Sequence, residues 1–326
     1  MKFNSITKAL VTTTLIATAF TAAAHTNEDN TPHSHGYENS IHLPHDHTVL
    51  HDFTDVSIKN IDHSLEHVRG NLYRHTSGNG LAVHSGFVLD TEEGVVVIDP
   101  AMTATAKWLN EEIQQRFGKK VTYVIYTHAH ADHILGTNVF KEDGATIVAN
   151  KRAIEPIIGE KLDVPLPDIV FDDDMTLNVG GEEIYLKRVA PSHSDSLTLV
   201  YFPKYKAMQC TDICQAQTMP YSDFLDFYYT GWIDTLDWVI EQDVEVMDVG
   251  HYWLSNKENQ IALREYLVDL HQQVLDLNRQ GMTWDQLWRN VKFSDEVKSW
   301  TGYDVMAFRN IVGMQRWVEN HRRGNW

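Results

Sequence analysis

Three histidines and an aspartate crowd into the short run between Thr127 and His133. Imidazole nitrogens and carboxylate oxygens are ligands that zinc accepts, at distances of about 2.0–2.2 Å. Alternation along the chain can send His128 and His130 to one metal, while the turn that follows aims Asp132 and His133 at another. Without a metal, all four side chains would need hydrogen-bond partners in the same small space. The run therefore predicts a metal site.

An apolar segment, residues 121–126, leads directly into this motif and predicts a buried strand. Ligand sites of layered α/β proteins form where such strands end. The hydrophobic pattern predicts strands in runs and then strands that alternate with helices, which indicates sheets packed inside helical layers. The other expected strands are residues 71–75, 81–89, 95–98, 146–149, 176–179, 183–189, 197–202 and 244–249, and another strand ends within 206–213. We expect helices at about 103–117, from 134, at 151–158 and at 232–240.

The motif and its context resemble the metallo-β-lactamase superfamily, whose α/β fold is a four-layered αβ/βα sandwich. The resemblance covers about residues 70–255 and implies further ligands at the ends of later strands, in a set order. His193 stands in a polar turn before a strand, Asp212 follows a strand, and His251 closes one. Taken singly, each has an ordinary explanation as a turn cap, a helix cap or a core residue. Their order along the chain matches the family.

The resemblance also implies a role for each of these residues. One zinc would be held by His128, His130 and His193, a second by Asp132, His133 and His251, and Asp212 would lie between the two as a shared ligand. Asp99 matches a buried aspartate of the family and would accept a hydrogen bond from a ligand histidine. A plain Asp-Pro turn explains Asp99 equally well.

Two zinc ions a few ångströms apart can share a hydroxide, because bound water loses a proton near neutral pH. By resemblance, Asp132 would orient that nucleophile, and the substrate would be an ester, lactone, thioester or lactam of a small molecule. A shared aspartate at Asp212 is the pattern of lactonases and thioesterases, whereas one β-lactamase subclass has cysteine there. Cys210 and Cys214 each lie two residues away from that position. This favours an acyl hydrolase over a β-lactamase proper.

Two other functional classes stay open. Some proteins of this fold hold one iron through two histidines and a carboxylate and oxidise persulfides; two zinc ions per chain would exclude that class. A non-enzymatic zinc-binding protein is suggested by the histidine-rich residues 25–51, which can either bind metal or form a solvated tail. Deleting this segment would abolish most zinc uptake by such a protein, whereas the enzyme would keep two tightly bound zinc ions.

The N-terminus predicts export. Residues 1–24 combine Lys2 and Lys8, an apolar stretch too short to span a bilayer, and a small-x-small alanine site, which is the pattern of a secretory signal peptide. We expect a periplasmic or secreted protein. Its later parts are expected to be a flexible linker at 25–67, a metallo-β-lactamase-like domain at 68–255 and a helical C-terminal extension at 256–326.

The composition of the chain excludes some classes of binding partner. The net charge of −18, with no cluster of Lys or Arg, argues against nucleic acid or an anionic membrane, and no later segment is long and apolar enough to span a bilayer. We therefore expect a small-molecule substrate; the oligomeric state is not indicated. The only cysteines are Cys210 and Cys214, and a bridge across their four-residue spacing would depend on local geometry. We expect instead two small buried side chains.

Aromatic residues gather between the Asp212 and His251 positions. They could wall a substrate pocket in which a tyrosine hydroxyl stabilises an oxyanion. The alternative, packing in the core against the C-terminal helices, is the commoner fate of aromatic side chains. The residues concerned are Tyr221, Tyr228, Tyr229 and Trp232.

Overall fold

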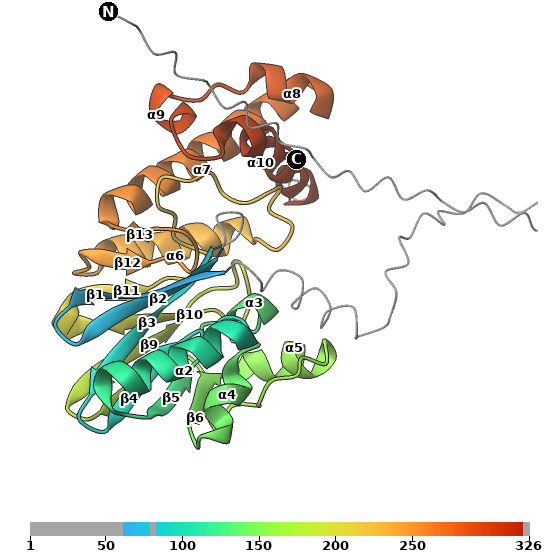
Figure 1. The fold of residues 1–326 in the computed structure, drawn as a ribbon. Coiled ribbons are helices and arrows are strands. Elements are labelled where there is room, and N and C mark those ends of the chain that lie inside the picture. Colours follow the sequence, from blue (N-terminus) through green and yellow to red (C-terminus); the bar gives the residue numbers. More distant parts are fainter. Residues whose placement is uncertain (1–60, 79–82, 322–326) are drawn as a thin grey trace, which may run out of the picture. The chain divides into compact units, whose positions relative to one another are not determined.

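The computed structural model describes residues 61–78 and 83–321, which form two β-sheets that share a core (Figure 1). The predicted signal peptide and the predicted linker up to residue 60 lie outside the described residues. The strands of the first sheet lie in chain order: β1 (Asp62–Arg69), β2 (Leu72–Gly78), β3 (Val83–Thr91), β4 (Gly94–Ile98), β5 (Val121–Ile125), β6 (Thr146–Asn150) and β7 (Ile169–Phe171). The second sheet has the order β13 (Leu254–Ser255), β12 (Val246–Asp248), β11 (Ala207–Gln209), β10 (Thr198–Phe202), β9 (Glu182–Arg188) and β8 (Asp174–Val179).

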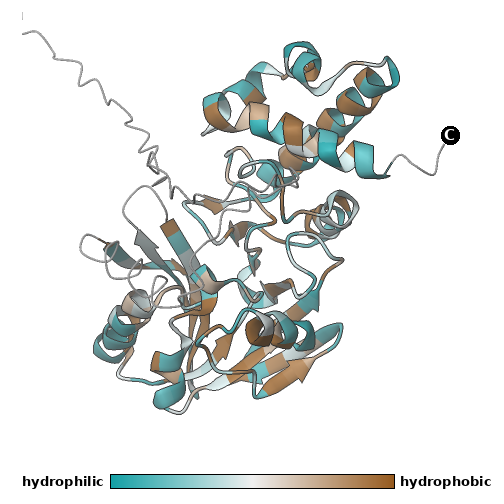
Figure 2. Ribbon diagram, turned by 90° about the vertical axis from the view of Figure 1, so that its right-hand side faces the viewer, coloured by the Kyte–Doolittle hydropathy of each residue, from teal (hydrophilic) through white to brown (hydrophobic). Residues whose placement is uncertain are grey.

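Helices cover the outer face of each sheet (Figure 1), and Figure 2 shows hydrophobic and hydrophilic residues interspersed along them. Their buried apolar residues belong to the two outer cores. The helices on the side of the first sheet are α2 (Thr103–Phe117), the short α3 (Ala131–Ile134), α4 (Thr137–Glu142) and α5 (Ile154–Gly159), which follows the 3-10 turn η2 (Lys151–Ala153). Those on the side of the second sheet are α6 (Tyr229–Glu241), α7 (Lys257–Arg279), α8 (Trp284–Asn290), α9 (Asp295–Lys298) and α10 (Tyr303–His321). A second 3-10 turn, η3 (Pro203–Tyr205), joins β10 to β11.

Strand β4 shows why the first sheet is covered on both faces. Val95 and Val97 pack in the core that contains Leu109 of α2, whereas Val96 and Ile98 pack in the core between the sheets. Successive side chains of a strand point to opposite faces, so a strand without polar residues must be buried on both. The resulting layers, helix, sheet, sheet and helix, confirm the predicted αβ/βα sandwich.

Several predicted elements agree closely with the structure. Helix α2 spans the predicted residues and ends at Gly118, whose φ of 65° is the left-handed conformation that glycine adopts easily. Strand β1 was missed: it begins at Asp62, inside the segment predicted as linker, so the ordered chain starts before residue 68. The hydrophobic pattern could not indicate β1, because it is an edge strand whose one buried residue is Leu65.

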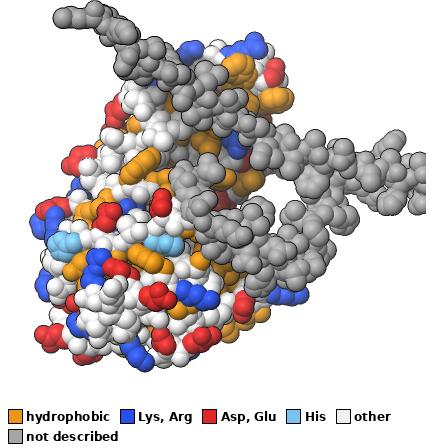
Figure 3. All heavy atoms as spheres, viewed as in Figure 1, with side chains coloured by type: hydrophobic (Ala, Val, Ile, Leu, Met, Phe, Trp, Pro, Cys, Tyr) orange, Lys and Arg blue, Asp and Glu red, His pale blue; other side chains and the backbone are white. Residues whose placement is uncertain are grey.

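The C-terminal helices share their core with the second sheet. Leu263, Leu267 and Leu270 of α7 are buried together with Leu199 of β10 and Met208 of β11. The helical character predicted for this region is confirmed. Among the described residues, no helix is both long and apolar enough to cross a membrane. Where grey atoms do not cover it, the face seen in Figure 3 mixes acidic, basic and apolar side chains.

Candidate metal centre

The predicted ligands meet at one edge of the two sheets, where strands end. Strands β4 and β5 run parallel, as do β11 and β12, so the carboxyl ends of each pair lie together. The motif follows β5, and the other ligands come from the loops after β9, β11 and β12. The structure therefore brings together all the residues predicted as ligands: His128, His130, Asp132, His133, His193, Asp212 and His251.

Asp212 lies at the centre of this cluster, and its side chain is 10% exposed. Its Oδ2 lies 3.0 Å from His133 Nε2, 3.2 Å from His193 Nε2 and 3.4 Å from His128 Nε2. Its Oδ1 lies 3.0 Å from His251 Nε2. One carboxylate thus contacts imidazoles from both predicted ligand triads, as a ligand shared between two metals must.

The remaining two ligands complete the two groups. His130 Nδ1 lies 2.9 Å from His193 Nε2, which places both beside the first predicted metal position. Asp132 Oδ2 lies 3.4 Å from His133 Nε2 and 3.9 Å from His251 Nε2, on the side of the second. The side chain of Asp132 is 44% exposed, so the second position faces solvent more than the first.

The electrostatics of the cluster suit a cation. Burial lowers the pKa of His128 well below its usual value, so this imidazole is neutral. Burial alone would raise the pKa of Asp212, but the neighbouring His133, His251 and His193 hold it well below its usual range. Burial opposes the charge of His133 as well, yet Asp212 and Asp132 raise the pKa of His133 to about 10. In the metal-free protein, a proton on His133 thus compensates two carboxylates that a metal ion would otherwise neutralise.

A buried lone pair provides a second test of whether metal fits. His128 Nδ1 is within 3.0 Å of Thr127 Oγ1, and among the described residues His128 Nε2 is buried without a hydrogen-bond partner. Buried polar atoms are normally paired, and a neutral Nε2 is a common zinc ligand. Nitrogen and oxygen donors in this number and arrangement therefore fit metal ions.

Asp99 supports the site through a relay. The fully buried carboxylate accepts hydrogen bonds from Thr127 N (2.8 Å), Thr127 Oγ1 (2.6 Å) and Thr211 Oγ1 (3.1 Å). Because Thr127 donates its hydroxyl proton to Asp99, its oxygen must be the acceptor toward His128, and His128 Nδ1 therefore carries the proton of that hydrogen bond. The direct hydrogen bond that we predicted from a ligand histidine is replaced by this relay, since Asp99 Oδ2 lies 4.0 Å from His133 Nδ1. Burial raises the pKa of Asp99 to about 6.

The loop that carries His251 is anchored by residues that sequence reasoning missed. The buried Asp248 accepts hydrogen bonds from Ser85 Oγ (2.8 Å), Gly250 N (2.7 Å) and Arg74 Nε (2.5 Å). These partners come from β2, β3 and the loop itself. No local motif connects them, and only the pairing of distant segments identifies them.

His84, in β3, is a further residue that the sequence did not indicate. Its Nε2 lies 3.2 Å from Asp132 Oδ2, and its side chain is 17% exposed. It lies far from the motif in the sequence, inside a segment whose pattern predicts only a strand.

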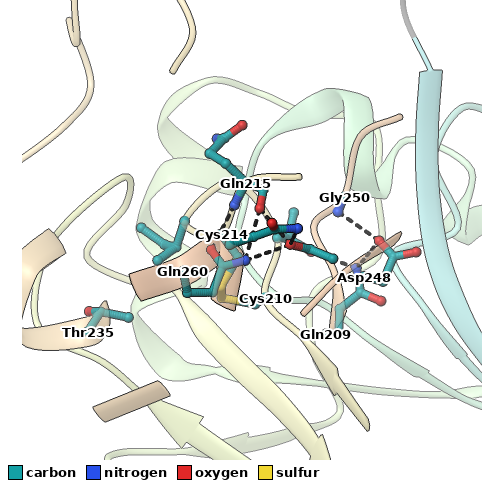
Figure 4. The surroundings of a disulfide bond; sticks show 12 residues. Gln209, Cys210, Cys214, Gln215, Thr235, Asp248, Gly250 and Gln260 are labelled. Carbon is teal, nitrogen blue, oxygen red and sulfur yellow. Dashed lines mark hydrogen bonds between the residues drawn. A yellow bond between two sulfur atoms is a disulfide. The ribbon is translucent and has the colours of Figure 1, made fainter. Parts of the chain in front are cut away.

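The two cysteines form a disulfide, which corrects our expectation of separate buried side chains (Figure 4). The chain leaves β11 and turns at Asp212, whose φ is 62°, so that Cys214 N donates to Cys210 O at 3.3 Å. The turn brings the two Cα atoms to 5.6 Å, within the usual range for a disulfide. The central carboxylate of the site thus lies inside a covalently closed loop.

The aromatic segment divides between core and cavity. Trp232 is buried and donates from Nε1 to Ile213 O (2.9 Å), as in the core alternative. It also borders a cavity of about 220 Å³, together with Tyr228, Tyr229, Phe227 and residues of α10. The centroid of the Phe227 ring lies 4.9 Å from that of the imidazole ring of His193, one of the predicted ligands. Tyr221, by contrast, is 76% exposed and does not line the cavity.

Comparison with known proteins identifies the family of this chain. Residues 78–251, more than half of the chain, match the family described as the metallo-beta-lactamase superfamily. The chain belongs to the metallo-β-lactamase superfamily. It is accordingly a metal-dependent hydrolase, with the histidine and aspartate groups described above as its candidate metal ligands.

Individual relatives share 28% identity with this chain over about 60% of its length. The chain is 28% identical over 205 residues to a metallo-beta-lactamase type 2 of Bacillus sp. (strain 170), an alignment that covers 60% of this chain and 78% of the relative. It is also 28% identical over 201 residues to the 2,4-dinitroanisole O-demethylase subunit alpha of Nocardioides sp. (strain JS1661), and this alignment covers 60% of each protein.

Two solved structures have a similar fold, and the second matches a larger share of this chain than the first. A metallo-beta-lactamase from Pontibacter korlensis matches with a TM-score of 0.56 and 18% identity, covering 63% of this chain and 99% of that one. The sec-alkylsulfatase Pisa1 from Pseudomonas sp. matches with a TM-score of 0.62 and 18% identity, covering 81% of this chain and 51% of that one. At these identities the similarity concerns the fold alone.

Proposed function

We propose that this superfamily member is an exported dinuclear zinc hydrolase that cleaves an acyl bond of a small molecule. The observation that carries the proposal is the position of Asp212, whose two carboxylate oxygens contact imidazoles of both ligand triads at 3.0–3.4 Å. His128, His130 and His193 would hold one ion and Asp132, His133 and His251 the other. Once bound, the metal pair would activate water and polarise the bond to be cleaved.

The residues of the chain prepare this chemistry in distinct ways. The Thr127 hydroxyl keeps the proton of His128 on Nδ1, which leaves Nε2 free as a ligand. Asp132 is the exposed carboxylate of the cluster and can orient the attacking group, while Asp99 holds Thr127 from the buried side.

The substrate class rests on two features. An aspartate at the shared position, rather than a cysteine, is the lactonase and thioesterase pattern of the superfamily. The cavity beside Phe227 has aromatic walls, which suit an apolar group of the substrate. An ester, a lactone or a thioester with an apolar acyl chain is therefore the favoured substrate, ahead of a β-lactam.

Export is supported by the disulfide as well as by the signal-like N-terminus. Disulfides persist in oxidising compartments such as the periplasm and are rare in the cytosol. Cys210 and Cys214 are fully buried in the core, which suits a permanent structural bond.

Metal analysis of the purified mature protein, combined with a substrate panel, tests the proposal. The panel contains a lactone, a thioester, a phosphodiester and a β-lactam, with an aryl methyl ether and a secondary alkyl sulfate added because of the similar proteins. We expect two zinc ions per chain and turnover of the lactone or thioester. A single iron per chain, or a fully metallated protein that cleaves none of the panel, would contradict the proposal.

Asp212→Ala is the sharpest variant, and Asp173→Ala, on an exposed side chain, is its matched control. We expect Asp212→Ala to weaken binding of both zinc ions by at least about 100-fold, because each site loses a charged ligand. If both ions stay bound at unchanged affinity, the shared-ligand assignment is wrong. Deleting residues 25–51 should leave two zinc ions bound; loss of most zinc would favour the zinc-binding protein.

A further inference from the structure

His84 is held next to His251 by backbone pairing. The two residues form an isolated antiparallel bridge, and Ser85 N donates to Gly250 O at 2.8 Å. His251 Nδ1 donates to Val83 O at 2.9 Å, which leaves its Nε2 for the metal cluster. The centroids of the two imidazole rings are 5.0 Å apart. The position of His84 is thus set by the same contacts that position a predicted ligand.

The spacing of His84 from Asp132 is that of ligands on a common ion. Two donors that are each about 2.0–2.2 Å from one zinc lie about 3.0–3.6 Å apart, depending on the angle between them. His84 Nε2 lies 3.2 Å from Asp132 Oδ2. His84, Asp132 and His251 each offer a donor atom, and these three atoms lie within 4.8 Å of one another.

We propose that His84 is an additional ligand of the second metal position, alongside Asp132, His133 and His251. This inference rests on the two-metal site of the proposed function. The competing arrangement is a hydrogen bond from His84 to Asp132 without contact to metal. Ligation is favoured because the donor atom of His84 lies within 4.8 Å of that of His251 as well as beside Asp132, whereas the hydrogen bond requires Asp132 alone. A third imidazole would also retain an ion at a position that is more exposed than the first.

Zinc titration of the metal-stripped mature protein, against a competing chelator, tests the proposal without an activity assay. The variants are His84→Ala and His84→Gln, and the control is His67→Gln, a histidine of β1 whose Nε2 contacts only the Gly70 carbonyl among the described hydrogen bonds. We expect the control and the wild type to bind two zinc ions equally. Both His84 variants should bind one zinc ion with the wild-type affinity and the other at least about 10-fold more weakly. Loss of a residue that only hydrogen-bonds to a ligand already weakens metal binding by about 10-fold, so loss of a ligand should weaken it by at least that much.

Cobalt(II) substitution separates ligation from hydrogen bonding, because the visible absorption of bound cobalt reports its ligands directly. Glutamine can still donate a hydrogen bond to Asp132, but it does not replace an imidazole ligand. We expect both His84 variants to change the spectrum of one cobalt site. A His84→Gln protein with the wild-type spectrum and zinc affinity would overturn the proposal, as would unchanged binding in His84→Ala. A wild type that binds fewer than two zinc ions would instead refute the proposed function.

Discussion

Arg74 and Asp248, which lie 174 residues apart in the sequence, form an ion pair inside the protein. Their side chains are 7% and 0% exposed, and Arg74 Nε lies 2.5 Å from Asp248 Oδ2. Arg74 also donates to Tyr252 O (2.9 Å), and Asp248 accepts from Gly250 N. The pair therefore holds the backbone of the residues on either side of His251.

Arg74→Met should destabilise the fold and loosen the loop, because it leaves Asp248 buried without its cation. Removing one partner of a buried pair costs about 3–5 kcal/mol. Urea unfolding measures this loss, and zinc titration measures the loosening as weaker binding of one ion. Arg69→Met is the control, since Arg69 pairs with Glu245 on the surface, where such a pair contributes about 0–1 kcal/mol. Equal losses in the two variants would show that the buried pair does not hold the loop.

Thr127→Val should weaken the first metal position while keeping the shape of the side chain. The variant removes the hydroxyl that joins Asp99 to His128 and frees the imidazole to adopt the wrong tautomer. Loss of such a partner typically lowers metal affinity or activity by about 10–100-fold. Thr105→Val is the control, because the buried Thr105 hydroxyl has no hydrogen-bond partner among the described residues. Wild-type zinc affinity in Thr127→Val would show that the relay does not matter.

Replacing both cysteines by serine should lower stability, because the disulfide closes a short loop around Asp212. In the chain-entropy account, closing such a loop stabilises the fold by roughly 2 kcal/mol. For a protein of about 300 residues we expect the melting temperature to fall by about 3–4 °C. Calorimetry of metal-stripped samples measures the effect of the loop without that of the metal. A melting temperature equal to that of the wild type would mean that the bond adds nothing to folding.

His75 should make stability depend on pH. Burial lowers the pKa of this β2 side chain from 6.5 to about 4, and its Nε2 donates to Asp99 O at 3.0 Å. As the pH falls below 6.5, the unfolded chain takes up a proton that the folded chain refuses until about pH 4, so stability is lost across that window. Between pH 7.5 and 5.0 the wild type should lose about 2 kcal/mol more than His75→Gln does.

Urea unfolding at the two pH values, with zinc removed by chelator, checks this expectation. The chelator keeps metal release from adding its own pH dependence, and the other histidines titrate equally in both proteins. An identical loss of stability in the wild type and in His75→Gln would show that His75 is not the residue responsible.

Much of the site could be read from local spacing and order. The residues from His128 to His133 follow a buried strand directly, so their proximity is a property of the chain itself. His193, Asp212 and His251 were predicted because their order after successive strands matches the family, and the structure brings them to the same edge. The helix ending at Gly118 was predicted because its boundaries depend on neighbouring residues alone.

Only the tertiary structure could reveal His84, the Arg74–Asp248 pair and the link between Cys210 and Cys214. The first two depend on the register of β2 and β3 against the loop after β12, and a shift of one residue would turn each side chain to the opposite face. The disulfide depends on the left-handed turn at Asp212, which the identity of the residue permits but does not require. The sequence by itself thus determined the family and the layers and predicted the metal ligands, because these follow from hydrophobic pattern and motif. The contacts that support the donors were decided by the packing of segments that are distant in the chain.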